Sequence, residues 1–189
     1  MIRLTILTYG KGMRFLYVYI TKFKHQKTNR LINEELSKLG YRNAIIRHNK
    51  YGKKYIDDNV FFNVSHSSSI LALVISNKEV GIDCECKHTD LLLPELKKVL
   101  NEDLFNVIDF YSKEPTGLIK FWTVLEAFIK CVGFGFCKEL NYFSINPKTN
   151  IIYNFLDDTN YNFSTFEYQE NYVTICTKDS LKECTIISD

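Results

Sequence analysis

The chain has 189 residues, of which 46% are hydrophobic and 24% are charged, and its formal net charge at pH 7 is +2. That length is enough to bury a substantial apolar core, whereas the small net charge argues against a nucleic-acid partner, which needs a basic stripe. No segment approaches the roughly 20 consecutive apolar residues that span a bilayer, so we expect a soluble protein with no membrane partner.

Two short apolar runs at residues 2–8 and 15–20 are predicted to form the first strands. Lys11 and Arg14 interrupt the apolar N-terminal region and no small-residue cleavage site follows, so we expect no secretory signal and a cytoplasmic location. A helix is predicted at 28–39, ending at a glycine.

Three strands are predicted next, at 61–64, 70–75 and 80–86. The run at 80–86 alternates strictly, so Asp83 and Glu85 leave the same face of the strand, about 7 Å apart at the backbone. A divalent cation with oxygen ligands would fit between two like charges at this spacing. A solvent-facing strand surface explains the pattern as well, and the spacing alone favours that interpretation.

The segment at 63–69 reads Asn-Val-Ser-His-Ser-Ser-Ser and precedes the apolar run at 70–75. A turn with hydroxyls, an imidazole and exposed backbone amides can hold a phosphate group. Taken alone, however, the segment is more readily explained as a serine-rich loop without a binding role.

Helical spacing is found at 91–111 and again at 117–132, where glycines end the second helix. Glu126 and Lys130 lie one turn apart on the polar face of that second helix. Such a pair ordinarily stabilises a helix surface by about 0.2–0.5 kcal/mol, and without context this interpretation is favoured. The functional alternative gives Glu126 a metal or base role and lets Lys130 neutralise charge on a phosphate.

The C-terminal region, residues 140–187, consists of short Tyr- and Phe-rich runs separated by turn residues. This pattern predicts an antiparallel meander. No low-complexity linker and no internal repeat is visible in the sequence, so any two-fold similarity between its halves cannot be detected there.

Read together and in order, three segments resemble the motifs of the 4'-phosphopantetheinyl transferase superfamily, in its single-chain, surfactin-synthetase-activating type. They are FNVSHSSSILALVIS at 62–76, VGIDCE at 80–85 and FWTVLEAFIKCVGFG at 121–135. The family pattern has a serine-histidine-serine turn, a G-[IV]-D-x-E strand and a W-[ST]-x-K-E-A-x-x-K helix. The resemblance is close over residues 47–137 and looser elsewhere.

The resemblance implies a set of catalytic and metal-binding residues. Asp83, Glu85 and Glu126 match the carboxylates that hold Mg2+, or Mn2+ in its place, against the diphosphate of coenzyme A. Glu126 also matches a proposed base, and Lys130 matches a lysine that contacts the phosphates. Asp83, Glu126 and Lys130 are therefore the expected catalytic residues.

The resemblance also implies residues that bind coenzyme A. Ser65 and His66 match the turn that holds the diphosphate and the 3'-phosphate, and Lys53 matches a basic residue of the nucleotide pocket. Arg30 matches an upstream phosphate-binding arginine. The chain departs from the family pattern at Leu125, where the helix motif has a lysine. It also departs at Lys54, where a proline usually follows Tyr-Gly-Lys, and at Phe134, where a basic residue often follows the glycine.

The activity implied is transfer of the 4'-phosphopantetheine arm of coenzyme A to a serine of an apo acyl or peptidyl carrier protein, with release of 3',5'-ADP. A monomer is expected. The implied fold is α+β, with two pseudo-symmetric subdomains at 1–80 and 81–189, each a small antiparallel sheet packed with a helix. The second subdomain would carry the metal carboxylates. A weakened module that only binds coenzyme A or a carrier, and a magnesium-dependent phosphohydrolase, are the alternatives.

Overall fold

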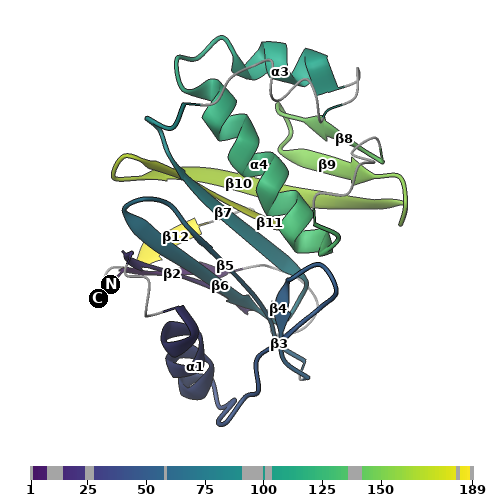
Figure 1. Cartoon of the computed structure of the whole chain (residues 1–189). Coiled ribbons are helices and arrows are strands. Elements are labelled where there is room, and N and C mark those ends of the chain that lie inside the picture. The colour runs from purple at the N-terminus through teal and green to yellow at the C-terminus, as the bar shows by residue number, and fades with distance from the viewer. Residues whose placement is uncertain are drawn as a thin grey trace.

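The computed structural model describes residues 2–7, 15–23, 28–57, 59–90, 100, 104–135, 142–181 and 184–187, with 2–7 and 184–187 described in their backbone only. These residues form two five-stranded antiparallel sheets, one two-stranded ribbon and three helices (Figure 1). None of the described helices is both long and apolar enough to cross a membrane.

The first sheet is built mainly from the N-terminal part of the chain. Its strands, in sheet order, are β12 (Cys184–Ile187), β1 (Ile2–Leu7), β2 (Phe15–Lys22), β6 (Ile70–Ser76) and β5 (Phe61–His66). Every residue of β6 is buried, as the continuous apolar run predicts for a strand covered on both faces. The helix α1 (Thr28–Lys38) covers one of these faces with Leu31, Ile32 and Leu36.

The second sheet follows in the chain. Its strands, in sheet order, are β7 (Val80–Cys86), β11 (Asn171–Thr177), β10 (Thr159–Tyr168), β9 (Ile151–Asn154) and β8 (Phe143–Asn146). The helices α3 (Phe105–Tyr111) and α4 (Gly117–Val132) pack on its outer face. The part of the predicted helix at 91–99 and 101–103 lies outside the described residues.

The predicted meander is confirmed for β8 to β11 but is wrong for the last strand. β12 pairs with β1 of the first sheet, with Arg3 opposite Ile187. β11 is already flanked by β10 and β7. Because no free edge remains beside β11, the last strand pairs with the open edge of β1 instead.

The two sheets pack face to face, so that Figure 1 shows four layers from α1 through both sheets to α4. On β7, Val80, Ile82 and Cys84 enter the core between the sheets. The alternate residues, Asp83 among them, face α4. The predicted α+β fold, with a helix packed on each small antiparallel sheet, is confirmed. The division at residue 80 stays a prediction.

Candidate active site

A cavity of about 670 Å³ lies between β5, an edge strand of the first sheet, and the C-terminal half of α4, which packs on the second sheet. Its walls come from the start of α1, residues 51–54, strand β5 and the C-terminal half of α4. Residues 51–53 lie in the turn between the strands β3 (Arg47–His48) and β4 (Lys54–Tyr55), and residue 54 begins β4. The volume is typical of a site that binds a small molecule or cofactor.

Side chains from three elements meet beside this cavity. The Lys130 ammonium on α4 donates hydrogen bonds to Asp83 Oδ1 on β7 at 2.6 Å and to Ser65 Oγ on β5 at 3.0 Å. The Ser65 hydroxyl in turn donates to Asp83 Oδ1 at 2.8 Å. Glu126 Oε2 lies 3.9 Å from Lys130 Nζ. The strand and the helix therefore direct their acidic groups toward the same lysine.

Asp83 is buried, and its second oxygen, Oδ2, has no hydrogen-bond partner among the described residues. A buried polar atom without a partner costs about 1–3 kcal/mol, and more when the group is charged. Such a cost is rarely retained without a function, so this oxygen is a candidate ligand atom for a bound cation.

Burial raises the pKa of both neighbouring glutamates. The pKa of Glu85 rises to about 7, through burial first and the charge of Asp83 second. The pKa of Glu126 also rises to about 7, through burial, while Lys130 opposes and Asp83 adds to the shift. Burial lowers the pKa of Lys130, but its charge and hydrogen-bond interactions with acidic neighbours outweigh this, and the net pKa is raised. The three carboxylates therefore share one partly desolvated, negatively charged region.

The carboxylates beside the cavity suit a magnesium ion that completes its coordination with phosphate oxygens and water. Among the residues that the structure describes, no three His, Cys, Asp or Glu side chains form a cluster that could hold a metal. Mg2+ commonly uses only one or two protein carboxylates and completes its coordination with phosphate oxygens and water. The unpartnered Asp83 Oδ2, with Glu85 or Glu126 nearby, suits that arrangement better than a preformed cage of three carboxylates.

The metal-free chain is expected to lose stability as the pH rises from about 4.5 to about 7. Across this window the folded state retains protons on Glu85 and Glu126 that the unfolded state has released, so unfolding becomes easier as pH rises. Urea unfolding in EDTA should show this as a difference from the doubly substituted Glu85→Gln/Glu126→Gln chain, whose amides do not titrate. A difference that stays constant across the window would contradict the raised pKa values.

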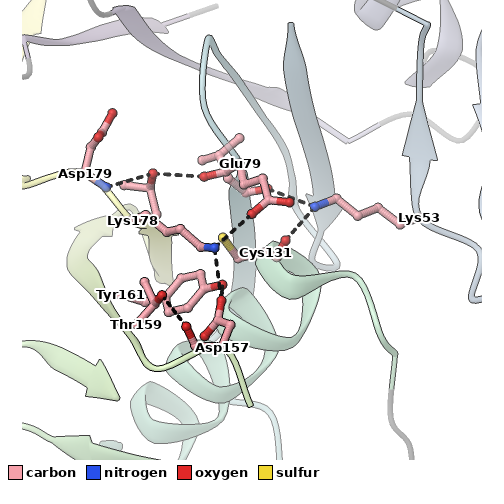
Figure 2. A network of polar contacts seen from close by, with 10 residues as sticks. Lys53, Glu79, Cys131, Asp157, Thr159, Tyr161, Lys178 and Asp179 are labelled. Carbon is pink, nitrogen blue, oxygen red and sulfur yellow. Dashed lines mark hydrogen bonds and ion pairs between the residues drawn. The ribbon is translucent and has the colours of Figure 1, made fainter. Parts of the chain in front are cut away.

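Lys53 lines the cavity, but its ammonium is engaged with the protein backbone. Its Nζ donates to the carbonyl of Cys131 at 2.8 Å and to that of Val80 at 3.5 Å (Figure 2). Burial lowers the pKa of Lys53. Its cation lies at the C-terminal end of α4, where the helix dipole favours positive charge. In this structure the hydrogen bond from Lys53 to the Cys131 carbonyl connects residues 51–54 to α4.

Asn49 makes the same connection and was missed by the sequence analysis. Its Nδ2 donates to the carbonyl of Gly133 at 3.0 Å, while its Oδ1 accepts from the backbone N–H groups of Tyr51 and Lys53. An asparagine followed by Lys-Tyr-Gly is a turn signal, which is the only trace of this role in the sequence.

The remaining predicted coenzyme-binding residues lie in different surroundings. His66 lines the cavity and stacks on Phe23, with ring centroids 4.3 Å apart. The Ser65 hydroxyl points to Asp83 and does not line the cavity. Arg30 is exposed, pairs with Glu34 on its own helix at 2.6 Å, and is not among the cavity-lining residues. The structure therefore brings His66 to the cavity but not Arg30.

The positions that depart from the family pattern also differ in their surroundings. Leu125 is completely buried in the core beneath α4. Lys54 lines the cavity, and its Nζ donates to Asn29 Oδ1 at 2.7 Å. Phe134 is exposed and packs edge to face against Tyr51, with centroids 6.2 Å apart. Two aromatic rings therefore lie at the end of α4, one of them, Tyr51, in the cavity wall.

Residues 79–177 match the model of the 4'-phosphopantetheinyl transferase superfamily. The chain is 32% identical over 114 residues to the 4'-phosphopantetheinyl transferase gsp of Aneurinibacillus migulanus, over 59% of this chain and 48% of the relative. It is 30% identical over 105 residues to a 4'-phosphopantetheinyl transferase of Bacillus subtilis, over 52% of this chain and 46% of the relative. The chain thus spans about half the length of the curated relatives it matches.

Proposed function

Because the chain belongs to the 4'-phosphopantetheinyl transferase superfamily, we propose that it transfers the phosphopantetheine arm of coenzyme A to a serine of an acyl or peptidyl carrier protein. The observation that carries this proposal is the meeting of Asp83, Glu126 and Lys130 beside a cavity of about 670 Å³. Both relatives are named as 4'-phosphopantetheinyl transferases, which supports a transferase of this kind. We further propose that the chain acts as a monomer in the cytoplasm.

In the proposed reaction, the oxygen of the carrier serine attacks the β-phosphorus of coenzyme A. The bond from this phosphorus to the bridging oxygen breaks, and 3',5'-ADP leaves with the bonding electron pair. Phosphoryl transfer depends mostly on positioning and on neutralising charge, and Lys130 supplies a cation at the cavity wall. Glu126, with a pKa raised to about 7, is suited to accept the proton of the serine hydroxyl near neutral pH.

Asp83, through its unpartnered Oδ2, together with Glu85 or Glu126, would hold Mg2+, or Mn2+ in its place. When bound, such an ion neutralises charge on the diphosphate oxygens. Lys130 already contacts Asp83 Oδ1, so the lysine and the ion would use different oxygens of one carboxylate. His66, which lines the cavity, would contact a phosphate of the coenzyme.

Incubation of the chain with coenzyme A, Mg2+ and purified apo-carriers tests the proposal. Intact-mass measurement should show a carrier gaining the mass of one phosphopantetheine group, and EDTA should prevent the gain. Carriers from fatty-acid, polyketide and peptide synthesis should be tried, with the Bacillus subtilis relative as the positive control. If that relative modifies every carrier and the present chain modifies none, transfer is ruled out.

A non-catalytic module that binds coenzyme A or a carrier is the second candidate. It is favoured by Leu125, an apolar core residue where the family motif has a lysine, and by the aromatic rather than basic side chain of Phe134. Calorimetric binding of coenzyme A without any transfer would support this candidate. Release of phosphopantetheine into water, without a modified carrier, would instead indicate a phosphohydrolase.

A further inference from the structure

A side chain of the first sheet holds the edge of the second sheet next to Asp83. Asn63 on β5 accepts a hydrogen bond through its Oδ1 from the backbone N–H of Ile82 on β7, at 3.0 Å. β5 and β7 are edge strands of different sheets and do not pair with each other. The Asn63 amide therefore replaces the backbone acceptor that a neighbouring strand would have provided.

A second contact follows two residues along the same strand. Asn63 and Ser65 share one face of β5, because side chains alternate along a strand. Asn63 binds the backbone just before Asp83, and Ser65 donates to the Asp83 carboxylate at 2.8 Å. All three side chains are buried. The position of Asp83 relative to β5 is thus determined at two points, one on the backbone and one on the carboxylate.

We infer that Asn63 is a positioning residue for Asp83. Ile82 is completely buried, so loss of the Asn63 acceptor would leave its N–H without a partner and allow the β7 edge to move. A displaced edge would carry Asp83 away from Ser65 and Lys130. The inference rests on the proposed function in one respect, that Asp83 holds the cation. Groups that orient a metal ligand typically contribute about 10- to 100-fold to metal affinity.

Mn2+ binding to the free chain, followed by electron paramagnetic resonance without coenzyme A, tests this role separately from substrate contacts. That separation matters because Asn63 also lines the cavity. In Asn63→Ala the dissociation constant for Mn2+ should rise about tenfold, near the lower end of the range for such groups. The smaller change Asn63→Ser, whose hydroxyl is too short to reach Ile82, should weaken binding in the same direction and guards against misfolding of the alanine variant.

Asn154 offers a matched control. It is also buried, and its Oδ1 accepts from the backbone N–H of Leu156 at 3.1 Å, in the turn after β9. Asn154→Ala should lower the melting temperature as Asn63→Ala does, yet leave Mn2+ binding unchanged. Equal dissociation constants in both alanine variants would overturn the role of Asn63 while leaving the proposed transfer intact. If Mn2+ binding changes as expected but no carrier is modified, only the proposed transfer is overturned. If the free chain binds no Mn2+, the comparison is repeated with coenzyme A present, and absence of binding there as well would overturn both the cation site and the role of Asn63.

Discussion

Replacing Asp83 with asparagine is expected to lower the rate of the proposed phosphopantetheine transfer by at least about a thousandfold. Asp83 would hold the cations that neutralise phosphate charge, and a cation in this role contributes about 10³- to 10⁵-fold. The asparagine has the same shape and can still accept from Ser65, but it lacks the negative charge that attracts Lys130 and a metal ion. Glu126→Gln should behave similarly. Single-turnover transfer at saturating coenzyme A and Mg2+ measures the loss, and thermal unfolding confirms that the variant folds.

Asp157 provides the matched control, because it makes the same two kinds of contact away from the cavity. It accepts from the Lys178 ammonium at 3.0 Å and from the Tyr161 hydroxyl at 2.8 Å (Figure 2). Asp83 accepts from Lys130 and Ser65 in the same way. Asp157→Asn should change the melting temperature but not the transfer rate. Near-normal turnover of Asp83→Asn in excess Mg2+ would contradict the assignment of Asp83, and an equal loss in both variants would indicate a global effect.

The features that sequence predicted well are those set by local periodicity. The alternation at 80–86 predicted which residues of β7 face the core, and Val80, Ile82 and Cys84 do lie between the sheets. The helical spacing at 117–132 predicted α4, and its apolar side chains, including Phe121 and Phe128, form the buried face. Burial enforces such patterns because a shift by one residue would expose every apolar side chain of the strand.

The partners of polar side chains could not be predicted in this way. Ser65 contacts Asp83, and Lys53 contacts Cys131, across distances in sequence that no local pattern covers. Both residues were singled out by motif, yet which atoms they contact depends on how elements far apart in the chain meet. Arg30 is the exception, because Glu34 follows it by four residues in the same helix, and this spacing favours an ion pair on the helix surface. The structure contains that ion pair.

Gly81→Ala is expected to destabilise the chain by about 3 kcal/mol, near the upper end of the usual cost of overpacking a core. A Cβ atom at Gly81 would lie 2.1 Å from the carbonyl oxygen of Ala127 and 2.4 Å from the backbone nitrogen of Cys131. Both are backbone atoms of α4, so no side chain can rotate away and the helix itself would have to move. Urea unfolding of the variant measures the loss.

Gly40→Ala separates this packing effect from the conformational preference of glycine. Apart from its chain neighbours, no atom of the described residues lies within 4 Å of a Cβ at Gly40. Its φ of +97° is unfavourable for alanine, which should cost about 1–2 kcal/mol. Equal losses in both variants would contradict the close approach of β7 and α4. Because Asp83 lies two residues after Gly81 and Lys130 directly precedes Cys131, moving α4 outward would also lengthen the ion pair of 2.6 Å. Gly81→Ala should therefore reduce transfer even at temperatures where the chain remains folded, whereas Gly40→Ala should not.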